Sequence, residues 1–183
     1  MTRKKNNTRA HPAPAPPPPP HPQPNNSNNR QAGIWFRQFH PFVYDPTAGL
    51  LSNFTRLAAQ RNWGPKLRRR RWTECQEEEF GHAFGTDTNK LAAWQELCRE
   101  VGIVEEEVPG SIRGCRTVLG SPKVLVNLVN LIDHRNLGVE VIRFKSFAQF
   151  RAFTVPNHIF PKNKAKEEGF IRALLRKVLY VGV

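Results

Sequence analysis

The sequence predicts a mainly α-helical fold: a compact bundle of six or seven short helices, with at most one isolated short strand, behind a disordered N-terminal tail. Apolar residues recur every three or four positions in most segments after residue 33, and capping and breaking residues separate these segments. Residues 1–33 contain no Val, Ile, Leu, Phe, Tyr or Trp, and nine of the sixteen prolines lie between Pro12 and Pro24. Such a segment cannot bury enough apolar surface to offset its ordering entropy. We therefore expect a disordered tail over 1–33 and a single helical domain over 34–183.

The first half of the expected domain contains three helices. Asp45, a favourable N-cap that precedes a proline, starts the first helix, which runs to about Arg61. The spacing of the apolar residues predicts a second helix over 67–84 and a third over 88–101. Gly102 then stands where a glycine commonly ends a helix.

The second half is expected to contain four further helices. Ser111 and Ser146 are favourable N-caps, each followed by apolar residues at helical spacing. The same spacing predicts a helix over 124–134 and a last one over about 164–179, which is apolar on one side and basic on the other. Residues 139–144 are the one strand candidate, because they are rich in β-branched residues.

The net charge of +13 and the pI near 10.4 conceal an uneven distribution of charge. Residues 61–72 carry six basic groups and no acid, residues 73–107 carry ten acidic groups and two basic ones, and residues 108–183 carry thirteen basic groups and four acids. Two interpretations are open. Either the two signs compensate each other on the folded surface, or the basic segments form a face for a polyanion such as nucleic acid.

Three features predict an intracellular protein that is not secreted. The N-terminus lacks the apolar stretch of a signal peptide. The most apolar stretch, residues 124–132, is nine residues long and too short to cross a bilayer, so we expect no membrane association. Cys75, Cys98 and Cys115 are odd in number and widely spaced, as expected of free thiols in a reducing compartment. With the basic runs, these features favour the nucleus, and the cytoplasm is the alternative.

The most distinctive motif is a run of arginines near the expected start of the second helix. Six basic residues lie among the eleven from 61 to 71, and contiguous arginines cannot all face a core. Such a run is typical of phosphate neutralisation or of a nuclear-import signal. The alternative is a solvated face that pairs with the glutamates four residues further on. The candidate nucleic-acid-binding residues are Arg61, Lys66, Arg68, Arg69, Arg70, Arg71, Arg113 and Arg116.

No pattern in the sequence indicates catalysis, so we expect a binding protein that uses no cofactor. Phosphate-cradling glycine motifs and a nucleophile elbow are absent from the sequence. The consecutive glutamates at 77–79 and 105–107 are typical of solvated faces. A zinc site would have to draw on the three cysteines with His82 or His134, but no Cys-x-x-Cys or His-x-x-x-His pair is present. The cysteines fall on apolar faces of expected helices, which favours small buried core residues.

Two functional hypotheses follow, and neither is enzymatic. The first is a basic helical module that binds nucleic acid, DNA or RNA, through the arginine run. The second is a protein-interaction adaptor, in which the polyproline segment Pro16–Pro20 binds a protein partner and the arginine run serves only for import. An aromatic side chain exposed beside the arginines, such as Trp63 or Trp72, would favour the first hypothesis. A large apolar groove without converging basic residues would favour the second.

Three parts of the sequence carry a family resemblance. They are Tyr-Asp-Pro-Thr at 44–47 with Phe-Thr-Arg-Leu-Ala at 54–58, Trp-Gln-Glu-Leu-Cys-Arg-Glu-Val-Gly-Ile at 94–103, and the run that begins Phe-Pro-Lys at 160–162 and ends Ala-Leu-Leu-Arg-Lys at 173–177. With these stretches, residues 35–178 resemble a family of small ascomycete fungal proteins that has no assigned activity. The resemblance implies a fungal, non-secreted protein and transfers no functional residue.

A second resemblance rests on two tryptophans and a short basic helix. Arg71-Trp72-Thr73 precedes an acidic helix, Trp94 follows 22 positions after Trp72, and Gly114-Cys115-Arg116 falls in a later helix. This spacing is similar to that of Myb/SANT-type helix-turn-helix domains, in which the third helix can enter the major groove. The sequence departs from the pattern, because Cys115 replaces the third aromatic residue and three glutamates at 105–107 occupy the loop. Helical spacing alone also explains Trp72 and Trp94 as core residues.

Overall fold

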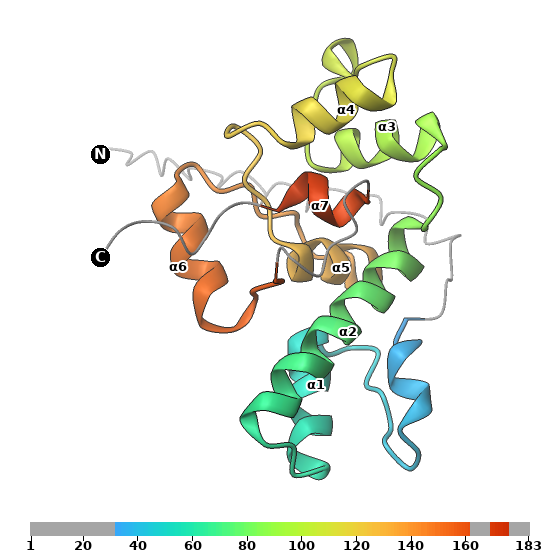
Figure 1. Ribbon diagram of the computed structural model, residues 1–183, viewed down its shortest axis with the longest axis vertical. Helices are drawn as coiled ribbons and strands as arrows, with labels where there is room; N and C mark the ends of the chain where they lie inside the picture. Colours follow the sequence, from blue (N-terminus) through green and yellow to red (C-terminus); the bar gives the residue numbers. More distant parts are fainter. Residues whose placement is uncertain (1–31, 162–168, 176–183) are drawn as a thin grey trace, which may run out of the picture.

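The computed structural model describes residues 32–161 and 169–175, and over these residues the fold is mainly helical, as the sequence predicts. This part of the chain contains seven α-helices, two short 3-10 helices and no strand (Figure 1). In chain order the elements are η1 Trp35–Gln38, α1 Leu50–Gln60, α2 Pro65–Phe84, α3 Leu91–Glu100, η2 Glu105–Glu107, α4 Ile112–Leu119, α5 Leu128–Leu137, α6 Phe147–Asn157 and α7 Phe170–Leu174. Most of the expected tail, and much of the helix expected over 164–179, lie outside the described residues.

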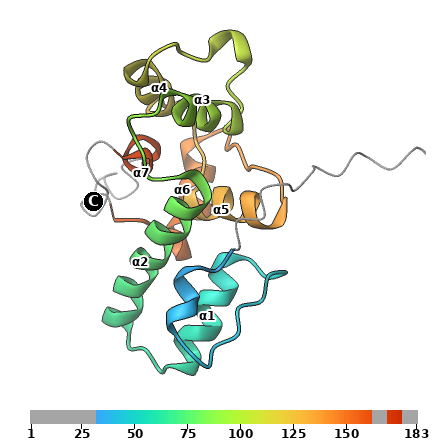
Figure 2. The same ribbon diagram turned by 90° about the vertical axis from the view of Figure 1, so that its right-hand side faces the viewer.

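The longest helix, α2, runs along the molecule and connects its two ends (Figures 1 and 2). At one end η1 and α1 pack against α2, and α5 packs against both α1 and α2. At the other end α3 packs against α4, and α4 packs against α7. The buried side chains of both ends belong to one hydrophobic cluster, so the two ends share a continuous core.

The first predicted helix begins later than expected. Helix α1 starts at Leu50, so the prediction that Asp45 caps it is wrong. The Asp45 carboxylate accepts hydrogen bonds from the backbone N–H and the hydroxyl of Thr47, at 2.9 and 2.7 Å, and so closes a turn ahead of the helix. The N–H of Leu50 donates instead to Oδ1 of Asp133 in α5, at 2.7 Å. A carboxylate from a distant helix therefore stabilises the start of α1.

Helix α5 also starts later than the apolar spacing predicts, at Leu128. Its N-cap is Asn127, whose Oδ1 accepts the N–H of Val129 at 2.9 Å. The other side of the same amide donates to the hydroxyl of Thr154 in α6, at 3.2 Å. Residues 124–126 are buried without regular secondary structure, so their apolar character reflects burial and not helix formation.

Residues 139–144 form no strand, and the prediction of one is wrong. The backbone of this segment forms hydrogen bonds with a side chain of a helix, whereas the backbone of a strand bonds to a neighbouring strand. Asn130 of α5 donates from Nδ2 to the carbonyl of Glu140 at 3.1 Å, and its Oδ1 accepts the N–H of Ile142 at 2.7 Å. β-Propensity reflects how well side chains pack on a sheet. It does not indicate whether the fold provides a partner strand.

Three predicted helix boundaries are confirmed. The hydroxyls of Ser111 and Ser146 each accept the backbone N–H of the residue three positions further on, at 3.1 and 3.3 Å. Gly102 has a positive φ of 83°, and the N–H of Ile103 bonds to the carbonyl of Cys98 at 3.0 Å. This is the hydrogen bond of a Schellman motif, and it needs the left-handed backbone that glycine adopts at little cost.

Candidate nucleic-acid interface

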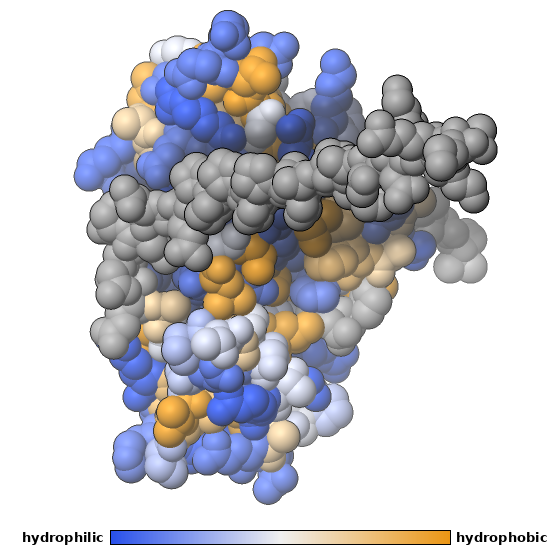
Figure 3. All heavy atoms as spheres, turned by 180° about the vertical axis from the view of Figure 1, so that it is seen from behind, coloured by the Kyte–Doolittle hydropathy of each residue, from blue (hydrophilic) through white to orange (hydrophobic). Residues whose placement is uncertain are grey.

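One end of the described chain carries an excess of positive charge. Residues 32–73, which form η1, α1 and the start of α2, contain eight basic residues and one acid, Asp45. We call this region the basic end. Figures 1 and 2 both place it at the opposite end of the molecule from α3 and α4. On the face seen in Figure 3, hydrophilic side chains dominate both ends, and several hydrophobic ones show in the middle.

Two arginines of the basic end hold the aromatic segment that follows η1. Arg56 donates from Nη2 to the carbonyl of Val43 at 3.0 Å, and its guanidinium lies 5.2 Å from the ring centroid of Phe42. Arg61 donates to the carbonyl of His40 at 2.6 Å. Because α1 and its C-terminal cap carry both arginines, these contacts fasten residues 39–44 to α1. Arg61, a predicted phosphate contact, therefore has a structural partner within the protein.

Arg71 also has structural contacts. Its guanidinium lies 5.8 Å from the ring centroid of Phe39 and donates to the carboxylate of Glu74 at 2.9 Å. Glu74 also lies 3.4 Å from Nε of Arg70, one helical turn before it. The glutamate therefore compensates part of the arginine run, as the solvated-face interpretation predicts for i to i+4 pairs.

The remaining basic side chains at the start of α2 are exposed and weakly held. Within the described chain Lys66 and Arg69 form no ion pair or hydrogen bond through their side chains. The guanidinium of Arg68 makes one contact, with the hydroxyl of Thr55 at 3.4 Å. The side chain of Arg70 is exposed, and its contact with Glu74 is long, at 3.4 Å. These four residues lie within the first two turns of α2, so several positive charges stand close together in solvent around the start of the helix.

The charge along α2 changes sign after the first two turns. Five of the six residues at positions 66–71 are basic, whereas Glu74, Glu77 and Glu78 follow on the exposed or half-exposed parts of the same helix. Positive charges at a helix N-terminus oppose the helix macrodipole, so the fold gains nothing from their placement there. The Lys and Arg side chains of α2 are therefore confined to its first two turns, at the basic end.

An aromatic cluster supports the basic end. Trp72, which would favour nucleic-acid stacking if exposed, is buried at 8% exposure and packs on Phe54 at 4.7 Å between ring centroids. Trp63 is half-buried and lies edge-on to Phe39 at 5.4 Å and to Trp35 at 6.2 Å. Trp72 is therefore closed to a stacking ligand and does not provide the exposed aromatic side chain that would favour nucleic-acid binding, and neighbouring rings flank Trp63.

A buried carboxylate ties the start of the basic end to α2. Glu79 is 1% exposed, and its two oxygens accept the backbone N–H groups of Gly33 at 3.0 Å and Trp35 at 2.8 Å. Burial raises the pKa of Glu79, and the two hydrogen bonds partly oppose that rise. The sequence-based interpretation of residues 77–79 as a solvated face is therefore wrong for Glu79. Helical spacing places Glu79 on the buried face of α2, four positions after Cys75 and four before Ala83, but its hydrogen-bond partners are more than forty positions away and leave no local signal.

The structure does not bring the two other predicted contact residues to the basic end. Arg113 and Arg116 lie on α4, at the far end of the molecule (Figure 1). Arg113 is exposed, whereas the guanidinium of Arg116 lies 5.1 Å from the ring centroid of Trp94. Arg116 is therefore part of the packing between α3 and α4. The predicted protein-binding segment Pro16–Pro20 lies outside the described residues.

The prediction of buried core cysteines is confirmed: Cys75, Cys98 and Cys115 are free thiols with no solvent exposure. In residues 32–161 and 169–175, no group of three or more His, Cys, Asp or Glu side chains is placed to hold a metal ion. None of the helices in those ranges is long and apolar enough to span a membrane. No protein-family model, curated protein or solved structure matches the chain.

Proposed function

We propose that this protein binds nucleic acid through the phosphate backbone, using the exposed basic side chains at the start of α2, and that it is a nuclear, non-enzymatic module. The observation that carries the proposal is the excess positive charge of the basic end: residues 32–73 hold eight basic residues and one acid, and Glu74 pairs with two of the eight, Arg70 and Arg71. Contacts of Lys and Arg with phosphates neutralise the charge of the nucleic-acid backbone and release the counterions bound to it.

The arginines of the basic end divide into two roles. Arg56, Arg61 and Arg71 bond to or pack on the aromatic segment and keep it in place. Lys66, Arg68, Arg69 and Arg70 extend into solvent from a helix that α5 and the aromatic cluster hold in position. A rigid support lowers the entropy cost of bringing several cations to one polyanion. The division also identifies which side chains can be replaced without disturbing the fold.

Replacing Lys66, Arg68 and Arg69 with alanine is expected to weaken nucleic-acid binding and to flatten its salt dependence. For duplex DNA each lost phosphate contact lowers the slope of log K against log salt by about 0.9, so the triple variant should lose roughly 2 to 3 in slope. The measurement is binding of the full-length protein to labelled duplex DNA, single-stranded DNA and RNA over a range of salt concentrations. The strand type with the tightest binding identifies the partner.

The matched control replaces Lys123, Lys145 and Arg151, three exposed basic residues away from the basic end, and removes the same net charge. Its salt slope should stay close to that of the wild type. Equal losses in the two triple variants would mean that net charge alone drives binding. No binding by the wild type near physiological salt would refute the proposal.

A further inference from the structure

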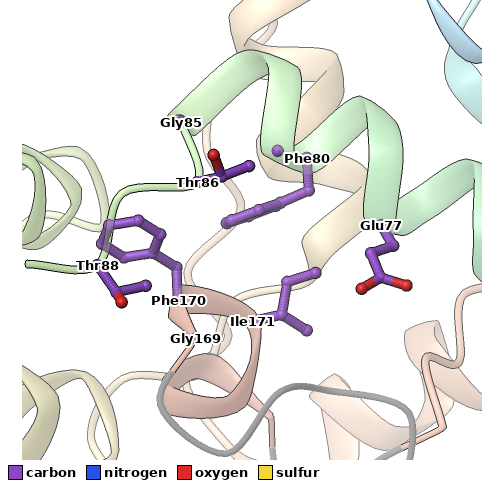
Figure 4. Close-up of a pocket in the computed structure, with 9 residues that line it drawn as sticks. Glu77, Phe80, Gly85, Thr86, Thr88, Gly169, Phe170 and Ile171 are labelled. Carbon is purple, nitrogen blue, oxygen red and sulfur yellow. The ribbon is translucent and has the colours of Figure 1, made fainter.

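The hollow between the C-terminal end of α2 and α7 is too small for an organic ligand. It has a volume of about 90 Å³, whereas ligand sites usually exceed roughly 300 Å³. Figure 4 shows Phe80 and Phe170 beside it, and both rings are almost fully buried in the hydrophobic core. Core packing therefore accounts for this hollow, which leaves the surface as the place for a partner.

Residues 139–144, which link α5 to α6, use one edge of their backbone for hydrogen bonds. The N–H of Ile142 donates to Oδ1 of Asn130 at 2.7 Å. The N–H of Phe144 donates to the carbonyl of Leu125 at 3.0 Å. The N–H groups of residues two positions apart therefore point to the same side. This alternation is that of an extended backbone, so the segment has the geometry of a strand with one edge paired.

The opposite edge of the segment is unpaired. Val141 and Arg143 alternate with the bonded residues, and their N–H and carbonyl groups form no hydrogen bond within the described chain. Two donors and two acceptors are therefore open to the backbone of another extended chain. An unpaired edge of this kind is a template for a further strand. The β-branched sequence of residues 139–144 suits such an addition.

Apolar side chains are exposed along the same segment. Val139 and Ile142 are 41% and 39% exposed, and they are two of the five large apolar side chains that are exposed in the described chain. Residues 139 and 142 lie on opposite faces of an extended backbone. A peptide that pairs with the free edge places its own side chains beside both faces and covers part of this apolar surface.

The charge beside the free edge is positive. Residues 141–161 contain three Lys and Arg residues and no Asp or Glu. Arg143 and Lys145 are exposed and form no ion pair within the described chain. The guanidinium of Arg143 lies against the backbone of Gly102, where a Cβ atom would overlap it, so packing holds this charge beside the edge. Glu140 is the one acid of the segment, and alternation puts it on the opposite face from Arg143.

We propose that residues 139–144 are a docking edge for an extended peptide of a partner protein, in which carboxylate side chains alternate with β-branched apolar ones. The peptide pairs its backbone with Val141 and Arg143. Its carboxylates lie on the face of Arg143 and Lys145, and its apolar side chains lie on the face of Ile142. A second copy of the same edge would bring like charges together and is disfavoured. The proposal is independent of nucleic-acid binding, because the segment lies outside the basic end.

The test is an NMR titration of the full-length, ¹⁵N-labelled protein with the peptide acetyl-(Val-Glu)₃-amide. The first control is acetyl-(Val-Lys)₃-amide, which reverses the charge. The second is the acidic peptide N-methylated at every residue, which keeps the charge and cannot donate backbone hydrogen bonds. We expect the acidic peptide to shift the amide signals of Val141 and Arg143 and to slow their exchange with solvent. No binding of this peptide, or equal binding of either control, would overturn the proposal.

Two substitutions at one exposed position separate the charge from the hydrogen bond. Arg143→Gln removes the charge and should weaken binding of the acidic peptide about fivefold. Arg143→Pro also removes the N–H on the free edge and should weaken binding about fivefold further. That N–H has no partner in the described chain, so its loss costs the fold no hydrogen bond.

The matched control is Arg113→Gln, which makes the same change of charge at an exposed residue of α4 and should leave the affinity unchanged. Equal weakening by Arg113→Gln and Arg143→Gln would show a response to net charge alone and overturn the proposal. Analytical ultracentrifugation of the wild type and of Arg143→Pro tests for a second copy at the edge. We expect both proteins to have the same oligomeric state. A wild-type dimer that Arg143→Pro dissociates would assign the edge to self-association and overturn the proposal.

Discussion

Replacing Trp94 with alanine is expected to lower the free energy of unfolding by about 4 kcal/mol. The indole is fully buried, and its Nε1 donates to the carbonyl of Thr88 at 2.8 Å. Its ring lies 4.3 Å from that of Phe170 in α7, and Arg116 of α4 covers it at 5.1 Å. One side chain thus joins α3, α4 and α7, and its removal leaves a cavity and an unpaired carbonyl. Urea denaturation of the two proteins measures the difference.

Trp94→Phe is the control for this prediction, because it keeps most of the packing and loses the hydrogen bond. We expect it to cost about 1 kcal/mol, the usual contribution of one such bond. A loss below 1 kcal/mol for the alanine variant would show that α3, α4 and α7 do not share a core around this residue.

Replacing Glu79 with alanine is expected to cost about 3 kcal/mol of unfolding free energy. The substitution leaves the buried N–H groups of Gly33 and Trp35 without acceptors and releases the start of the basic end from α2. Trp35 is 1% exposed and packs on Phe54 and Trp63, so the loss extends into the aromatic cluster. Glu78→Ala, at an exposed neighbour, should change stability little. Comparable losses in the two variants would contradict the anchoring role.

The pH dependence of stability provides an independent test of Glu79. Burial raises the pKa of its carboxyl above the ordinary value of 4.5, so the folded protein binds this proton more tightly than the unfolded chain does. The contribution of the group to the free energy of unfolding therefore falls as the pH rises from 4.5 through the raised pKa. Glu79→Gln cannot titrate. From pH 4.5 to 7 the stability of the wild type relative to this variant should decrease, and a relative increase would contradict the assignment.

The sequence predicts the helices well where the determining interactions are local. Ser111, Ser146 and Gly102 mark helix ends through hydrogen bonds that span three to five residues, and the structure confirms all three. The predicted burial of the three cysteines also follows from helical spacing within single segments. Hydrogen bonds and spacing within one segment can therefore be predicted from a single sequence.

The errors arise where a distant side chain supplies the hydrogen bonds. Asp133 caps α1 from 83 positions away, and Asn130 pairs with residues 140 and 142 in place of a neighbouring strand. Helical spacing separates Glu79, on the buried face of α2, from its exposed neighbours, but only the return of the chain at residues 33–35 reveals the hydrogen bonds that it accepts. The arginine run shows the same limit: its exposure follows from the sequence, but the contacts of Arg61 and Arg71 with the aromatic segment do not.

The central claim is that the basic end is the nucleic-acid-binding surface. The most direct test is to titrate the full-length, ¹⁵N-labelled protein with a short duplex or single-stranded oligonucleotide at physiological salt and to map the shifted amide signals. The account predicts the largest shifts over residues 64–70, at the turn before α2 and its first two turns, with little change in α3 and α4. Shifts confined to α4 around Arg113, or to residues 1–31, would place binding elsewhere and contradict the account.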